Sequence, residues 1–288
     1  MDLIQNIEIE KDFENAAIDL PDRSEKNKMS PPVIIDEIRS KNRRFLVIRD
    51  DLLPGGSKQR ACYSLLEDYL SNGFNHFCYA SPFAGFAQVA LAYAAQQMNL
   101  SCHLFCEMDP TQNFSGAMHE FTLLARSFGA EITMVKTLGE AESRATDAAM
   151  DLKGSIKIPL GFNCSAFKIA FEREILIEWA RVRTFLGKTP KRLWLPVGSG
   201  TLASVFNRVL DSETQLHCVN VRVLPASDDR IQMFHQNPRV RMYTTPESFQ
   251  QKANCAPSIP SNVHYDAKIW QFLDRFGQDG DVWWNVAR

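Results

Sequence analysis

The chain has 288 residues, of which 45% are hydrophobic and 23% charged, a composition typical of a globular protein with a sizeable core. Its net charge of −2 provides no overall attraction to nucleic acid, although it is compatible with a local basic surface. No run of about 18 apolar residues occurs in it, which excludes a membrane-spanning helix.

The hydrophobic pattern alternates short strands with helices after a polar arm at residues 1–30. We predict strands at residues 45–48, 76–80, 102–106, 132–135, 193–197, 216–224 and 280–288. We predict helices at residues 63–70, 88–98, 114–128, 140–152, 166–185 and 267–276, and one that begins at 202. Residues 228–260 are rich in Gln, Asn and Pro and are predicted to be irregular. This alternation predicts an α/β fold with mostly parallel sheets flanked by helices.

The cysteines and the first residues of the chain indicate the cellular compartment in which we expect the protein. Seven cysteines at irregular spacings, with no Cys-X-X-Cys pair, predict free buried thiols and no metal site. The opening sequence MDLIQNIEIEKDFENAAIDL is acidic and lacks the basic start and apolar centre of a signal peptide. We therefore expect a cytoplasmic protein that does not contact a membrane.

A glycine-rich turn follows the strand predicted at residues 193–197 and precedes a helix. It consists of Gly198, Ser199, Gly200 and Thr201. Glycines there let backbone N–H groups turn inward, and the helix start adds unpaired N–H groups, so the turn is suited to bind a phosphate. A plain tight turn is an equal alternative from these residues alone. The turn is neither a Walker A loop nor a complete G-x-G-x-x-G motif.

A lysine follows a Gly-Gly turn at a helix start in RDDLLPGGSKQRA, residues 49–61. An amine held there, partly desolvated and near Arg60, would be nucleophilic at neutral pH. A solvated lysine is the commoner arrangement, although the helix dipole disfavours a cation at this position. A third segment, YASPFAGFAQVALAYAA at residues 79–95, feeds an alanine-rich helix suited to close packing against a sheet or a planar ligand.

In this order, the three segments resemble the fold-type II pyridoxal-phosphate (PLP) enzymes, the tryptophan synthase β-like group, over residues 31–288. Within it, the chain is most similar to the 1-aminocyclopropane-1-carboxylate (ACC) deaminase and D-cysteine desulfhydrase family. The resemblance implies that PLP is held as a Schiff base on Lys58 and that residues 198–201 hold its phosphate. VHYDAKIW, residues 263–270, resembles a family segment whose tyrosine faces the substrate, which nominates Tyr265 as a second catalytic residue.

Two segments depart from the family pattern. Relatives usually carry an asparagine that contacts the ring hydroxyl in the loop before the alanine-rich helix; here Ser81 and Gly85 remain as candidate substrate-binding residues. Relatives also tend to end in Thr-Gly-Gly, whose threonine meets the pyridine nitrogen. Here Val286 has no hydrogen-bonding side chain, which leaves Asn285 as a candidate cofactor contact.

The loop before the alanine-rich helix also gains Pro82, Phe83 and Phe86. Apolar groups do not compensate the desolvation of a free carboxylate, because an unpaired buried charge is costly. We therefore expect a small free zwitterion to be a poor substrate. The resemblance further implies a homodimer of two-lobed subunits, with residues 31–77 and 166–288 in a large PLP-binding lobe and residues 78–165 in a small lobe.

We predict a PLP-dependent lyase, of the deaminase or decarboxylase type, that acts at Cα of an amino-acid-bearing substrate larger than a free small amino acid. An alternative comes from GGSKQRA and WNVA, which are similar to segments of phage-encoded relatives. Some phage PLP enzymes act on amino acids attached to thymine, so double-stranded DNA carrying a modified thymine, in the host cytoplasm, is a second candidate substrate. The residues that would meet DNA phosphates are Arg230, Arg239, Arg241 and Lys252, although a solvated loop is the commoner role for such residues. A second alternative is a non-catalytic PLP-fold binding protein.

Overall fold

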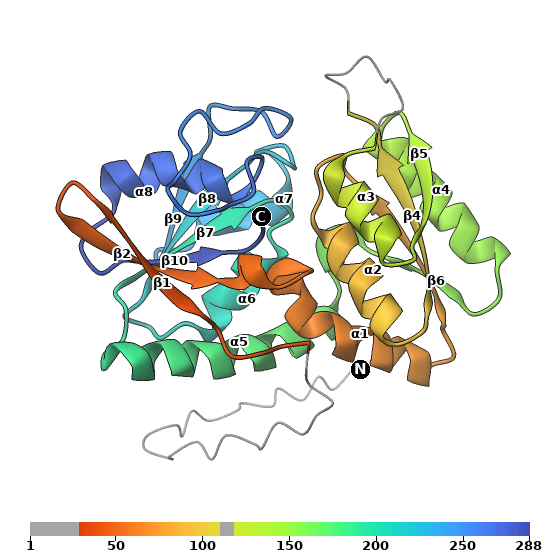
Figure 1. Cartoon of the computed structure of the whole chain (residues 1–288), viewed down its shortest axis with the longest axis horizontal. Coiled ribbons are helices and arrows are strands. Elements are labelled where there is room, and N and C mark those ends of the chain that lie inside the picture. The colour runs from red at the N-terminus through yellow and green to blue at the C-terminus, as the bar shows by residue number, and fades with distance from the viewer. Residues whose placement is uncertain (1–28, 110–117) are drawn as a thin grey trace, which may run out of the picture.

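The computed structural model describes residues 29–109 and 118–288. Two sheets with flanking helices lie side by side in it (Figure 1). All strand pairs but one are parallel, which confirms the predicted α/β class. The predicted lobe boundaries at residues 78 and 165 stay predictions; the strands of the smaller sheet run from residue 76 to residue 158.

The larger sheet has six strands in the order β1-β2-β10-β7-β8-β9. They are β1 (Ile35–Ser40), β2 (Arg43–Arg49), β7 (Arg192–Val197), β8 (Gln215–Asn220), β9 (Val240–Thr244) and β10 (Val282–Asn285). β1 pairs antiparallel with β2, whereas the other pairs are parallel. The late strand β10 lies between β2 and β7, with Trp284 opposite Ile48. This insertion brings the residues after β2, after β7 and after β10 to one edge of the sheet.

The smaller sheet has four parallel strands in the order β5-β4-β3-β6. They are β3 (His76–Ser81), β4 (Ser101–Glu107), β5 (Glu131–Val135) and β6 (Ser155–Ile158). Its buried positions carry residues such as Phe77, Tyr79 and Leu104, as expected for a parallel sheet covered on its faces.

Eight α-helices surround the two sheets in the described part of the chain. They are α1 (Gln59–Ser71), α2 (Ala87–Gln97), α3 (Glu120–Ser127), α4 (Leu138–Asp151), α5 (Ser165–Leu186), α6 (Thr201–Val209), α7 (Asp229–His235) and α8 (Trp270–Phe276). The longest, α5, ends at Leu186 and is followed by Gly187, which adopts a left-handed conformation with φ of 63°. Among the described residues, no helix is both long and apolar enough to cross a membrane.

Several predicted elements need correction. β1, β6, β9 and α7 were not predicted, and α7 and β9 lie in the segment predicted to be irregular. The strand predicted to reach residue 224 ends at Asn220, because the Asn220 side chain accepts the backbone N–H of Arg222, whose φ is 65°. The helix predicted from residue 114 begins at Glu120, where the His119 ring accepts the N–H of Phe121; residues 114–117 lie outside the described residues.

The seven cysteines are all free thiols. Five are buried, as predicted, while Cys164 is half-buried and Cys255 is exposed. Residues 1–28 of the predicted polar arm lie outside the described residues, and Met29 and Ser30, at its end, are buried.

Candidate cofactor and active site

One pocket is lined by residues from segments beside both sheets. From the side of the smaller sheet come Tyr79, Pro82, Gly85 and Phe86, and from the side of the larger sheet come Lys58, Gly198, Ser199, Tyr265 and Val286. Five of the nine sequence-predicted site residues therefore meet in one pocket: Lys58, Gly85, Gly198, Ser199 and Tyr265.

Two close backbone contacts fix the turn that carries Lys58. A Cβ on Gly56 would lie 2.3 Å from the carbonyl oxygen of Val286, and a Cβ on Gly55 would lie 2.6 Å from Cα of Ala90 in α2. The N–H of Ser57 donates to that same Val286 carbonyl at 3.0 Å. The turn packs closely between α2 and the segment after β10. Glycines in the turn and alanines in α2 are needed because larger side chains would not fit at these contacts.

Burial changes the pKa of the Lys58 amine. Burial lowers the pKa of Lys58 to about 8, while Cys62 and Asp266 oppose that shift. Roughly a tenth of the amine is then neutral at pH 7, far more than for a solvated lysine. Arg60, which sequence reasoning placed near the amine as an activating cation, instead binds the buried carboxylate of Asp50. Desolvation, rather than a neighbouring cation, therefore raises the neutral fraction of the Lys58 amine.

Sequence reasoning missed Asp266, the residue that follows Tyr265. It is fully buried, and its carboxyl group accepts the N–H groups of Val286 at 2.7 Å and Ala287 at 3.1 Å. Burial raises the pKa of Asp266 well above its ordinary value, although the two N–H donors and Lys58 act in the opposite direction. The single acidic residue in the otherwise mostly apolar motif VHYDAKIW was the available signal.

The loop between β7 and α6 has the geometry of an anion cup. Gly200 has φ of 79° and precedes Thr201, where α6 begins, so the N–H groups of the first turn have no partner within the helix. The hydroxyl oxygens of Ser199 and Thr201 lie 3.1 Å apart. Gly161 lies so close to this loop that a Cβ on it would be 2.1 Å from Oγ of Ser199. The N–H of Gly198 donates to the Tyr265 hydroxyl at 3.0 Å, so that one donor of the loop is already engaged.

Four predicted site residues do not line the pocket: Ser81, Gly200, Thr201 and Asn285. The buried Ser81 hydroxyl donates to the carbonyl of Pro82 at 3.0 Å. The Asn285 amide donates to the carbonyl of Pro260 at 2.9 Å. Ser81 is thus turned into its own loop and Asn285 toward the segment before η6 (Asp266–Ile269).

Phe83 also stays out of the pocket lining. It is buried, and its ring packs edge-on against His119, Phe249 and His264 at centroid distances of 5.4 to 6.1 Å. Phe83 and His119 belong to the part of the chain that forms the smaller sheet, whereas Phe249 and His264 follow β9, so this aromatic cluster joins the two parts of the molecule.

The pocket suits PLP in the chemistry of its donors. It combines an amine with a lowered pKa, a helix-start anion cup and apolar walls that include Phe86 and Val286. A family model described as "Pyridoxal-phosphate dependent enzyme" matches residues 35–280. The chain belongs to this family. PLP is therefore its cofactor, and the protein is a PLP-dependent family member of the fold-type II class.

Solved structures show the same fold. The structure described as the ACC deaminase homologue has a TM-score of 0.75 at 15% identity, covering 90% of both chains. The O-acetylserine dependent cystathionine beta-synthase of Helicobacter pylori has a TM-score of 0.66 at 16% identity, covering 91% of this chain and 95% of that one. Diaminopropionate ammonia lyase of Escherichia coli has a TM-score of 0.66 at 11% identity, covering 91% and 86%. No curated protein sequence matches the chain.

Thr201 offers a test of the anion cup. Replacing Thr201 by valine keeps the side-chain shape but removes the hydroxyl that lies beside Ser199. Thr201 lies outside the pocket lining, so its hydroxyl would act by holding the hydroxyl of Ser199. A hydrogen bond of this kind contributes about 1 kcal/mol, so we expect PLP to bind the apo-protein about fivefold more weakly, measured by fluorescence titration. Ser204→Ala, which removes a hydroxyl bonded to the Thr201 carbonyl one turn later, is the control. Equal PLP affinity in Thr201→Val and the wild type would contradict a role for this hydroxyl.

Proposed function

We propose that the protein is a PLP-dependent lyase, of the deaminase or decarboxylase type, that acts at Cα of an amino-acid-bearing substrate. The observation that carries the proposal is the amine of Lys58, with a pKa lowered to about 8, in one pocket with the anion cup at Gly198 and Ser199. Bound PLP supplies an electron sink for a bond broken at Cα. The deaminase and ammonia-lyase names of structural relatives support the same class of reaction.

In this proposal the chain's own residues hold the cofactor and move protons. Lys58 would hold PLP through its amine, and the same amine would accept or donate the proton at Cα of the substrate. The residues from Gly198 to Thr201 hold the phosphate. Tyr265 assists from the pocket wall, where the N–H of Gly198 fixes its hydroxyl.

The substrate is proposed to be larger than a free small amino acid. Among the described residues that line the pocket, Lys58 is the only charged one, and the cofactor uses it. The Ser81 hydroxyl, the other candidate for a carboxylate, is engaged with Pro82. A free carboxylate would therefore enter the pocket without a cation to pair with, so contacts remote from Cα must supply the binding energy.

Turnover of small and large substrates tests this function. PLP-loaded protein would be incubated with D-cysteine, ACC or serine, and with amino-acid-modified thymidine, free and in a duplex. Release of ammonia, carbon dioxide and carbonyl product would be measured, with Lys58→Ala as the blank. We expect little turnover of the three small amino acids. Efficient turnover of any of them, with none of the larger compounds, would contradict the proposed substrate size.

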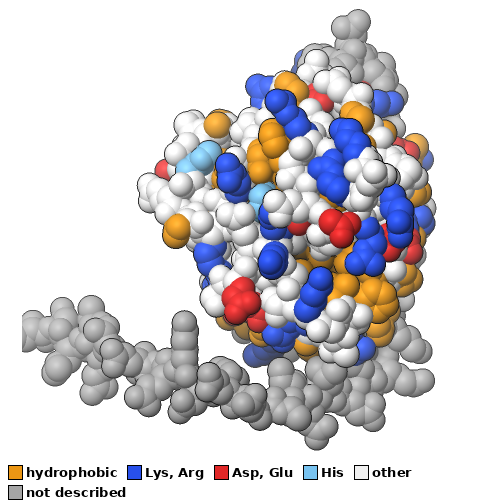
Figure 2. All heavy atoms as spheres, turned by 90° about the vertical axis from the view of Figure 1, so that its left-hand side faces the viewer, with side chains coloured by type: hydrophobic (Ala, Val, Ile, Leu, Met, Phe, Trp, Pro, Cys, Tyr) orange, Lys and Arg blue, Asp and Glu red, His pale blue; other side chains and the backbone are white. Residues whose placement is uncertain are grey.

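The phage DNA alternative has one surface observation in its favour. Figure 2 shows that Lys and Arg side chains outnumber Asp and Glu on the face of the molecule that is turned away from the smaller sheet. Of the predicted phosphate contacts, Arg241 and Lys252 are exposed. Arg230 pairs with Asp228 at 2.7 Å, and Arg239 donates to backbone carbonyls such as Leu210. The proposed set of four is thus reduced to two side chains available for DNA.

Binding to a modified-thymine duplex at two salt concentrations separates this alternative from the first proposal. Phosphate contacts would make affinity fall steeply as salt rises, whereas a metabolite enzyme would bind duplex DNA weakly at both concentrations. The third possibility, a non-catalytic binding protein, is favoured only if the loaded protein binds PLP normally and turns over none of the compounds.

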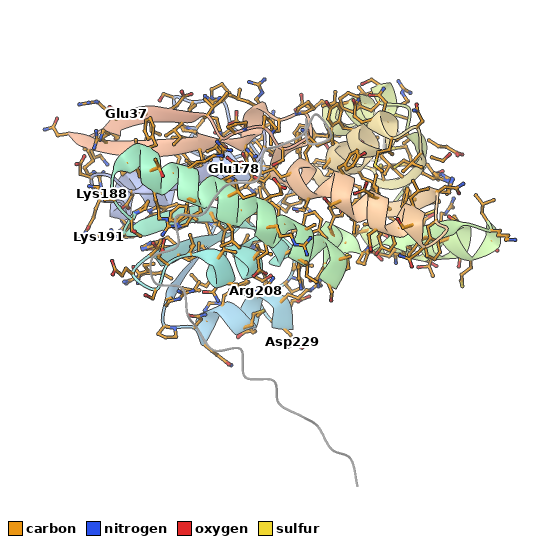
Figure 3. All side chains as sticks on the ribbon, turned by 90° about the horizontal axis from the view of Figure 1, so that it is seen from below. Glu37, Glu178, Lys188, Lys191, Arg208 and Asp229 are labelled. Atoms are coloured by element: carbon orange, nitrogen blue, oxygen red, sulfur yellow. The ribbon has the colours of Figure 1, made fainter. Side chains whose placement is uncertain are left out.

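A homodimer is also proposed. Ile169 and Leu176, seven residues apart on one face of α5, have 53% and 49% of their surfaces exposed. α5 runs along the lower surface of the molecule, as Figure 3 shows from below. Such apolar side chains on a surface helix are suited to contact a second subunit. Light scattering at micromolar concentration should report a dimer, and a monomer alone would contradict the proposal.

A further inference from the structure

Asn262 lines the pocket and carries an unsatisfied hydrogen-bond donor. The residue lines the pocket and is 2% exposed. Its Nδ2 is buried and has no hydrogen-bond partner among residues 29–109 and 118–288. The orientation of the amide is fixed, because Oδ1 accepts the N–H of His264 at 2.9 Å, and only the oxygen can play that role. The unpartnered atom is therefore the NH₂ group.

Three hydrogen bonds fix the backbone of Asn262. Its N–H donates to the carbonyl of Ala287 at 2.9 Å, and its carbonyl accepts the N–H groups of Tyr265 at 3.1 Å and Ala267 at 2.9 Å. Tyr265 and Ala287 both line the pocket as well. These bonds and the His264 contact hold the residue in place, so the amide has little freedom to turn.

A buried donor without a partner costs about 1–3 kcal/mol. An aspartate would make the same turn with His264, so the local structure does not require the NH₂ group. Asn262 is the only side-chain amide among the described lining residues. The Gln88 amide is not among these lining residues, and it donates to the carbonyl of Gly85 at 2.9 Å. The cost is relieved if a bound molecule places an acceptor against Asn262.

We infer that Asn262 donates from Nδ2 to an oxygen of the molecule bound in this pocket and thereby positions it. The acceptor is an oxygen with full or partial negative charge, a description met by the ring oxygen of PLP and by a substrate carboxylate. The inference rests on the proposed function only in taking this pocket as the PLP site. It assigns a positioning role to a residue that none of the sequence motifs contains.

The test is Asn262→Asp, which keeps the acceptor for His264 and replaces the donor by a second oxygen. PLP affinity of the apo-protein and the absorption maximum of the loaded protein report contact with the cofactor. The rate of reaction of the loaded protein with aminooxyacetate, a carboxylate probe, reports contact with a substrate. We expect at least a tenfold loss in PLP affinity, with a shifted maximum, or a tenfold loss in the aminooxyacetate rate.

The control is Asn237→Asp. Asn237 makes the same kind of turn, with Oδ1 accepting the N–H of Arg239 at 2.9 Å, but lies outside the pocket lining. Asn262→Ser, which keeps an oxygen acceptor but removes the NH₂ group, serves if the aspartate variant does not fold. Wild-type values of all three readouts in a folded Asn262 variant would overturn the inference. Failure of the wild-type protein itself to bind PLP would instead refute the proposed function.

Discussion

Replacing Lys58 by alanine is expected to abolish covalent attachment of PLP and all turnover. The side chain carries the only amine among the described residues that line the pocket. Removing it leaves the anion cup intact, so PLP should still bind, but reversibly. Borohydride treatment followed by mass spectrometry of peptides should label Lys58 in the wild type and no residue in the variant. Lys191→Ala, at an exposed lysine before β7, is the matched control.

The pH dependence of attachment offers a separate check on Lys58. Only the neutral amine attacks the aldehyde, and the pKa of Lys58 is lowered from 10.5 to about 8 by burial. The attachment rate in the apo-protein should therefore rise with pH up to about 8 and then level off. A rate that keeps rising toward pH 10 would show a lysine with an ordinary pKa.

Replacing Arg60 by leucine is expected to destabilise the fold by about 3–5 kcal/mol, because it leaves the buried carboxylate of Asp50 without its cation. Arg60 and Asp50 have side chains that are 1% and 0% exposed, and they are joined at 2.5 Å. The guanidinium also lies 3.8 Å from Glu178, which is fully buried, and donates to the carbonyl of Pro31 at 2.7 Å. Urea unfolding of the apo-protein should measure the loss.

The same substitution should disturb the site, because Asp50 also accepts the indole N–H of Trp284 at 2.7 Å. Trp284 donates to the hydroxyl of Ser57, next to Lys58, at 3.1 Å. Arg39→Leu is the control: Arg39 pairs with Glu37 on the surface, with 77% of its side chain exposed, and such pairs contribute at most about 1 kcal/mol. A loss below about 1 kcal/mol for Arg60→Leu would contradict a central role for the buried ion pair.

Much of the fold was predictable because its signals are local. The alternation of strand and helix patterns predicted most elements to within a few residues, and glycine clusters marked the turns of Lys58 and of residues 198–201. Gly56 and Gly200 indeed adopt positive φ, which a sequence pattern can report because few other residues tolerate it. The short strands β6 and β9, of four and five residues, were missed because so few residues make a weak pattern; β1 was also missed, although it pairs with the next strand along the chain.

What only the tertiary structure decided is the direction in which each polar side chain faces. Ser81 and Asn285 were plausible from their motifs, yet each donates to a nearby carbonyl that the sequence pattern does not mark. Asp266 meets two N–H groups about twenty residues further along the chain, and Asn262 keeps a buried donor beside the pocket. Such roles depend on the insertion of β10 between β2 and β7, a long-range pairing that places the segment after residue 285 against both the lysine turn and η6. The type of a residue determines which hydrogen bonds its side chain can make. Which partner it has, or whether it has one, depends on segments that are brought together only in the folded chain.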